Sequence, residues 1–130
     1  MNLYIEDKIH AIDWGEFSGP EYYSSEELID ALIHLNQYDE SKAKLDLDNK
    51  VLFAVGNNHA GTYYPAILKA ADIIIEIEQT SENEQARQCA SVILNGLYYF
   101  SPELGDYNKH SYEEIETFVK KKLLSYLDQP

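Results

Sequence analysis

The sequence predicts an all-α protein of about five helices arranged as antiparallel hairpins. Apolar residues recur at helical spacing through most of the chain. Ser-x-x-Glu capping boxes begin at Ser24 and Ser111. No segment has a convincing partner strand, and the short loops between successive helices favour antiparallel neighbours. The 130 residues fit one domain. Its expected parts are an N-terminal segment (1–23), a block of helix pairs (24–100) and a C-terminal capping helix (111–128).

The N-terminal segment has no single interpretation, because its apolar residues fit a helix or a short strand. Gly19-Pro20 marks a break in the chain. Ser24 or Ser25 then opens the first clear helix, which is expected to run to about Gln37. Its capping box is completed by Glu27, and acidic residues crowd the first turn, where the helix dipole favours them.

Residues 39–58 are open to two interpretations. Ala43, Leu47 and Val51 recur at helical spacing, whereas the apolar run 51–55 could be a strand of a hairpin. We favour the helix because the neighbouring segments are helical and no partner strand is evident. Gly56 and the asparagines after it are typical of a helix end.

The remaining chain predicts three more helices. Pro65 suits the first turn of a helix that runs to about Gln79. The next helix extends from Glu82 to about Tyr99, and a loop follows it. The capping box at Ser111 opens the last helix.

The charge of the chain excludes several kinds of partner. The sequence has 10 Lys and Arg residues against 23 Asp and Glu residues, a net charge of −13. Nucleic acids and anionic membranes require a basic face, so neither is an expected partner. A basic protein is the natural complement. No stretch of about 18 apolar residues is present and the first residues lack the apolar core of a signal peptide, so we expect a cytoplasmic protein.

The sequence contains no recognisable catalytic or metal-binding motif. Cys89 is the only cysteine, and the four histidines are too far apart to pair on one helix turn. The glycines are scattered, and no serine has the surroundings of a nucleophile. We therefore expect neither an enzyme, nor a metal site, nor a cofactor.

The acidic residues concentrate at the N-terminal end. Residues 1–40 hold ten acids and one basic residue, Lys8. Aromatic residues surrounded by charge are typical of protein interfaces, and the loop 13–23 has this composition; Trp14 within it is expected in the core. We expect the partner to contact Asp13, Glu16, Glu21, Tyr22, Tyr23, Glu26, Asp30, His59, Tyr63, Asp106 and Tyr107.

Two segments of the chain look alike. In each, a glycine-containing loop leads to a tyrosine pair and then to an amphipathic helix, with Tyr22 and Tyr63 spaced 41 residues apart. A period of roughly 40 residues is that of HEAT and armadillo helix pairs. The loop residues His59 and Thr62 are expected to hold the turn and to cap the following helix, respectively.

The loop 59–66, His-Ala-Gly-Thr-Tyr-Tyr-Pro-Ala, resembles the His-x-Gly-Thr-x-Tyr-x-Ala loop of a family of small bacterial HEAT-like proteins. Trp14 ahead of Gly19-Pro20 matches the same family, and the resemblance covers roughly residues 14–100. Members look like immunity proteins of polymorphic toxin and contact-dependent growth inhibition systems. The resemblance implies a short HEAT-like α-solenoid that binds and neutralises a cognate toxin domain without catalysis.

The charge is consistent with this resemblance. A toxin that acts on nucleic acid must be basic to hold its substrate, so the implied partner is a basic toxin domain such as a nuclease. An acidic inhibitor would imitate the phosphate field and speed association. The alternative is a non-catalytic helical adaptor or scaffold without a toxin partner. An enzyme built around His59 is the least favoured interpretation.

Overall fold

A computed structural model describes residues 3–17, 22–38, 47–103 and 112–126. These residues are mostly helical, which confirms the all-α prediction. The described α-helices number six rather than five, because the unassigned N-terminal segment contains a helix. They are α1 (Leu3–Ala11), α2 (Ser25–Asn36), α3 (Leu47–Val55), α4 (Ile67–Thr80), α5 (Glu84–Tyr98) and α6 (Tyr112–Leu123). Two short 3₁₀ helices, η1 (Trp14–Phe17) and η3 (Leu124–Tyr126), complete the helical part.

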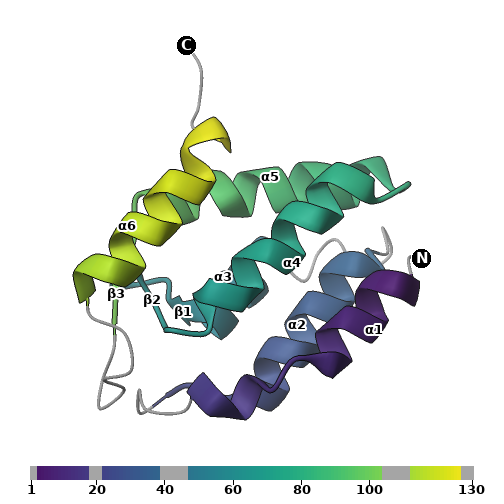
Figure 1. The fold of residues 1–130 in the computed structure, drawn as a ribbon. Helices are drawn as coiled ribbons and strands as arrows, with labels where there is room; N and C mark the ends of the chain where they lie inside the picture. The colour runs from purple at the N-terminus through teal and green to yellow at the C-terminus, as the bar shows by residue number, and fades with distance from the viewer. Residues whose placement is uncertain (1–2, 18–21, 39–46, 104–111, 127–130) are drawn as a thin grey trace.

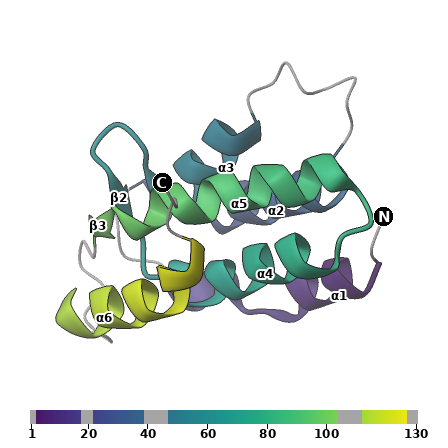
Figure 2. The same ribbon diagram turned by 90° about the horizontal axis from the view of Figure 1, so that it is seen from above.

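The helices form two layers around one core. Figures 1 and 2 together show α1, α4 and α6 in one layer and α2, α3 and α5 in the other. Helix α4 contacts α1, α2, α5 and α6 and is therefore central to the packing. Its apolar face explains this position, since Ile67, Ile74 and Ile77 are completely buried.

The N-terminal segment packs on the core through buried side chains and hydrogen bonds. Ile5 and Ile9 of α1 are completely buried, and the Trp14 indole donates a hydrogen bond of 2.8 Å to the Ile9 carbonyl oxygen. The Tyr23 hydroxyl donates to the Trp14 carbonyl oxygen at 2.7 Å. Trp14 itself is only 2% exposed, so its predicted place in the core is confirmed.

Helix α2 follows the predicted capping box. The Ser24 side chain accepts a hydrogen bond from the Glu27 amide, and the helix ends one residue before the expected Gln37. In the ambiguous region, residues 47–55 form α3, which confirms the preference for a helix over a hairpin there. Residues 39–46 lie outside the described part of the chain.

Helices α4 and α5 form the second hairpin, with boundaries that differ slightly from the prediction. Pro65 stands in a turn ahead of α4, which begins two residues later at Ile67. Helix α5 is capped by Asn83, whose side chain accepts hydrogen bonds from the amides of Gln85 and Ala86. The hairpins α2–α3 and α4–α5 pack on each other, as antiparallel helix pairs require.

A small sheet that the sequence did not predict lies at one end of the helices. Strand β2 (Thr62–Tyr63) pairs antiparallel with β1 (Gly56–Asn57) and parallel with β3 (Ser101–Pro102). Gly56 is required where β1 pairs with β2, because a Cβ atom there would collide with the Thr62 carbonyl oxygen. Gly61 supplies the left-handed turn between β1 and β2, with φ +68°.

The sheet also corrects the expected role of Thr62. Its hydroxyl donates a hydrogen bond of 2.7 Å to Glu103 Oε1 beyond β3. The N-cap of α4 is Ala66, which has no side-chain hydrogen bond. Thr62 therefore ties β2 to the segment after β3, and the prediction that it caps α4 is wrong.

The predicted repeat is only partly visible in the packing. Tyr22 is 75% exposed, whereas its counterpart Tyr63 is completely buried. The second tyrosines of the two pairs, Tyr23 and Tyr64, contact each other edge-to-face with ring centroids 5.8 Å apart. Two stacked hairpins agree with a helical-hairpin array, and the HEAT-like solenoid stays a prediction.

Helix α6 and η3 cover the end of the second hairpin, close to the expected C-terminal capping helix. Ile115, Val119 and Leu123 are its buried face. Lys120 donates hydrogen bonds to the carbonyl oxygens of Tyr98 and Phe100, which satisfies acceptors at and just beyond the end of α5. The capping box at Ser111 and residues 127–128 lie outside the described residues.

Candidate functional site

Helices α2 and α3 enclose a shallow cleft between their outer faces. The cleft has a volume of about 350 Å³ and is lined by Glu27, Asp30, Lys50, Phe53 and Ala54. Glu27 and Asp30 come from the first half of α2, and Lys50, Phe53 and Ala54 come from the middle and second half of α3. The cleft therefore brings acidic side chains next to an exposed aromatic ring, since Phe53 is 42% exposed.

One cation lies in this cleft, and it is already engaged. Lys50 Nζ lies 2.8 Å from Asp30 Oδ2 and 2.6 Å from His34 Nδ1. The hydrogen bond from Lys50, with the neighbouring His34 contributing, lowers the pKa of the Asp30 carboxyl. Lys50 is thus occupied by two partners of α2 and contributes little free positive charge to the cleft.

His59, in the turn between β1 and β2, contacts Phe53 at the edge of this cleft. Its imidazole packs edge-to-face on the Phe53 ring, with ring centroids 5.0 Å apart, and the residue is exposed. Sequence reasoning singled out His59 and missed Phe53, which is hidden in the apolar run of α3. If the apolar run is placed on a helix with one buried face and one exposed face, Phe53 falls on the exposed face.

Tyr22 and Glu27 lie together near the start of α2. Both act on the phenol of Tyr64, whose pKa is raised by burial and then by the negative potential of Glu103 and Glu27, with Tyr22 contributing. Tyr22 is the most exposed of the large hydrophobic residues described here. The start of α2 thus presents an aromatic ring beside a carboxylate.

We call this surface the acidic face and define it as Tyr22, Glu26, Glu27, Asp30, Phe53 and His59. Glu26 and Asp30 are one helical turn apart and share a side of α2. Glu26 and Glu27 form no ion pair with any residue in the described part of the chain. The helix dipole favours both glutamates in the first turn, but their negative charge remains open to a partner.

The structure separates other predicted contacts from the acidic face. Asp13 is exposed and near Tyr23, while Glu16 belongs to a different groove, described below. Tyr23 is part-buried and uses its hydroxyl within the chain. Tyr63 is wrong as a surface contact, because it is completely buried. Glu21, Asp106 and Tyr107 lie outside the described residues.

Tyr63 has a further unusual property. Its hydroxyl is buried and finds no hydrogen-bond partner among the described residues. Burial raises the pKa of the Tyr63 phenol well above its ordinary value, and the charge of Glu116 adds to the shift. The residue is therefore part of the core under α6 rather than part of a surface.

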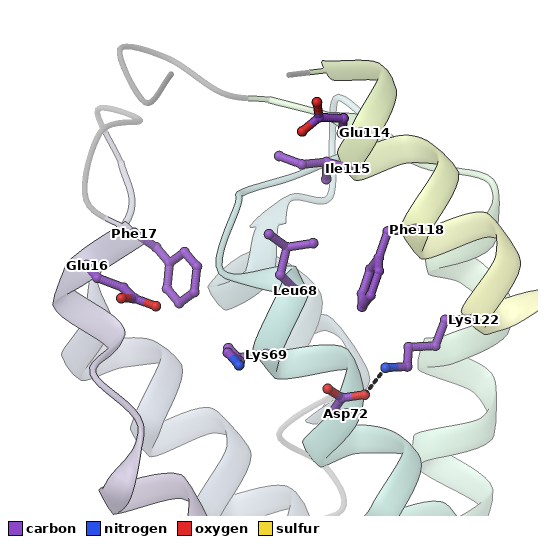
Figure 3. Close-up of a pocket in the computed structure, with 9 residues that line it drawn as sticks. All are labelled: Glu16, Phe17, Leu68, Lys69, Asp72, Glu114, Ile115, Phe118 and Lys122. Atoms are coloured by element: carbon purple, nitrogen blue, oxygen red, sulfur yellow. Dashed lines mark ion pairs between the residues drawn. The ribbon is translucent and has the colours of Figure 1, made fainter. Parts of the chain in front are cut away.

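A second concavity, which we call the α4–α6 groove, was not predicted from the sequence. Figure 3 shows Leu68 and Asp72 on α4 facing Ile115, Phe118 and Lys122 on α6, with Lys69 on the side of α4 that faces Glu16 and Phe17 of η1. The groove has a volume of about 580 Å³, and Glu114 also lines it. Phe17 and Ile115 are buried, while Phe118 is 39% exposed.

The groove carries both signs of charge. Lys122 forms an ion pair with Asp72, and its ammonium lies 4.7 Å from the centre of the Phe118 ring. Lys69 and Glu16 are both exposed and form no ion pair with each other or with another described residue. These two charges lie on different walls of the groove, one on α4 and one on η1 (Figure 3).

The described residues contain neither a candidate metal site nor a membrane-spanning helix. Within residues 3–17, 22–38, 47–103 and 112–126, no group of three or more His, Cys, Asp or Glu side chains could hold a metal ion. Across the same ranges, every helix is too short or too polar to cross a membrane.

Comparisons with known proteins add no assignment. The chain matches no protein-family model, no curated protein and no solved structure. The resemblance to HEAT-like immunity proteins therefore remains a prediction based on a short loop and a few flanking residues.

Proposed function

We propose that this chain is a non-catalytic binding protein that captures a basic protein partner on its acidic face. The observation that carries the proposal is the pair Glu26 and Glu27, which have no counter-ion among the described residues and lie near the exposed Tyr22. Aromatic anchors next to open charges are the composition of interface hot spots. The net charge of −13 adds long-range attraction for a basic partner.

The specific partner we propose is a basic toxin domain, with this chain as its immunity protein in the cell that makes both. We infer a toxin from the loop resemblance, and we infer that its surface is basic from the negative net charge of this chain. Carboxylates of the acidic face would pair with Lys and Arg side chains that the toxin needs to hold a nucleic-acid substrate. Inhibition would then be occlusion of the substrate surface, which needs no chemistry from this chain.

Affinity capture from a lysate of the source cells tests the proposal when it compares three proteins. The first is the wild type, and the second carries Glu26→Lys and Glu27→Lys. The third carries Glu82→Lys and Glu84→Lys, which reverses two exposed acids that flank the N-cap of α5 and matches the charge change. We expect one basic partner to be retained by the wild type and the control and lost by the acidic-face variant.

Expression of the captured partner separates an immunity protein from an adaptor. We expect the partner alone to stop growth and co-expression with this chain to restore it. A partner that is harmless when expressed alone would favour the adaptor. Many partners that elute together at modest salt would contradict specific capture and would indicate that the negative charge serves only solubility.

A further inference from the structure

The α4–α6 groove has the features of a ligand site that the acidic face does not use. Its volume of about 580 Å³ lies within the range of roughly 300–1,000 Å³ usual for small-molecule pockets. Its apolar wall consists of Leu68 and the exposed side of Phe118, above the buried Phe17 and Ile115. An apolar body of about the size of an aromatic ring could cover this wall and release water from it.

The charges of the groove restrict what such a body can carry. Asp72 and Lys122 pair with each other and largely cancel. The remaining charged side chains are Lys69 and Glu16, which line the groove from different elements and form no ion pair with each other. Glu114 lies in the first turn of α6, where the helix dipole offsets its charge.

Ligands with a single charge fit this arrangement poorly. Such a ligand would leave either Lys69 or Glu16 without an opposite charge in the groove. A ligand with both charges next to an apolar body satisfies the two residues together and bridges the gap between them. An aromatic α-amino acid is the simplest molecule with this combination.

We propose that the α4–α6 groove binds a free aromatic α-amino acid, with its carboxylate on Lys69, its ammonium on Glu16 and its ring on Leu68 and Phe118. This inference does not rest on the proposed function, because the groove and the acidic face share no residue. Recognition would therefore survive variants that abolish partner capture.

Titration of the full chain with three probes, followed by amide chemical shifts, tests the proposal. The probes are L-phenylalanine, 3-phenylpropionate, which lacks the ammonium, and phenethylamine, which lacks the carboxylate. We expect L-phenylalanine to bind about two- to fivefold more tightly than either analogue, as solvent-exposed ion pairs allow, and to shift the amides around Leu68 and Phe118.

Charge-removing variants assign the two contacts. Lys69→Met should abolish the advantage of L-phenylalanine over phenethylamine, and Glu16→Gln should abolish its advantage over 3-phenylpropionate. Lys121→Met and Glu113→Gln are matched controls, because both residues are exposed on α6 and neither lines the groove. Both controls should leave all three affinities unchanged. Unchanged melting temperatures would show that the variants remain folded.

Three results would overturn the proposal. One is equal binding of all three probes by the wild type, and another is the same loss in the controls as in the groove variants. The third comes from the blocked tripeptide acetyl-Lys-Phe-Glu-amide, which carries the same chemistry within a protein segment. If this peptide bound and L-phenylalanine did not, the free amino acid would be excluded as the ligand.

Discussion

At the scale of single residues, the tyrosines include exposed ones and ones buried in the core. The chain has 11 tyrosines, an unusual number for its length. Tyr22 is exposed just ahead of α2, whereas Tyr63 in β2 and Tyr64 directly after it are buried. Sequence reasoning gave Tyr22 and Tyr63 the same role, because the segments around them are alike. The side of the backbone on which each ring lies depends on the small sheet, which the sequence does not reveal.

The buried phenols make the fold sensitive to alkali. Burial raises the pKa values of Tyr23, Tyr63 and Tyr64 above the ordinary value of 10.0. Their folded pKa values exceed the unfolded ones, so their contribution to stability is complete below about pH 10 and is lost as the pH rises further. We expect helical circular dichroism and tyrosinate absorbance to change together above pH 10. Complete titration of all tyrosines with the helices intact would contradict this account.

Two tyrosine-to-phenylalanine variants should have opposite effects on stability. The Tyr63 hydroxyl is buried without a partner, so Tyr63→Phe removes an unsatisfied group and should raise the free energy of unfolding by about 1 kcal/mol. The Tyr23 hydroxyl donates to the Trp14 carbonyl oxygen, so Tyr23→Phe should lower it by about 1 kcal/mol. Urea denaturation of both variants measures the difference. A loss of stability in Tyr63→Phe would show that its hydroxyl has a partner.

At the scale of elements, helices were predictable and the small sheet was not. The capping box at Ser24 and the apolar spacing after it give α2 almost to its last residue. The strands are two residues long, too short for an alternating pattern to be visible. The helix α1 was missed for a related reason, since its few apolar residues fit both periods.

Gly56 shows how strongly one element depends on the close approach of another. Gly56→Ala places a methyl group against the β2 backbone, which cannot move aside like the end of a flexible side chain. We expect a loss of about 3 kcal/mol in the free energy of unfolding. Gly96→Ala is the control, because a Cβ atom there meets nothing within 4 Å and the helix interior favours alanine.

The control should gain about 1 kcal/mol, opposite in sign to Gly56→Ala. Thermal unfolding of the two variants and the wild type measures both changes in stability. Equal stability of Gly56→Ala and the wild type would mean that the backbones of β1 and β2 do not approach each other as closely as described.

At the scale of the whole molecule, sequence reasoning identified the charge but not where it acts. The excess of acids at the N-terminal end drew attention to the segment that contains α2. It could not show that Glu16 turns toward α4 and α6, or that Phe53 and His59 join α2 from distant segments. Such surfaces depend on how the layers pack, and apolar periodicity does not encode which polar residues meet across them.

The α4–α6 groove illustrates the same limit. Its walls come from η1, α4 and α6, which span most of the chain, and each contributes residues that look ordinary in the sequence. Lys69 reads as one more solvent-exposed helix residue until its neighbours are known. The groove and the acidic face are therefore products of the tertiary structure.

The central claim is that the acidic face recruits a basic partner by electrostatic attraction. The most direct test is the association rate constant of the purified chain with the captured partner, measured over a range of salt concentrations. We expect the wild-type rate to be high at low salt and to fall steeply as salt is added. The Glu26→Lys, Glu27→Lys variant should associate at least about tenfold more slowly at low salt, while the Glu82→Lys, Glu84→Lys control stays close to the wild type. Equal rates for the acidic-face variant and the control would contradict the claim and place the interface elsewhere on the molecule.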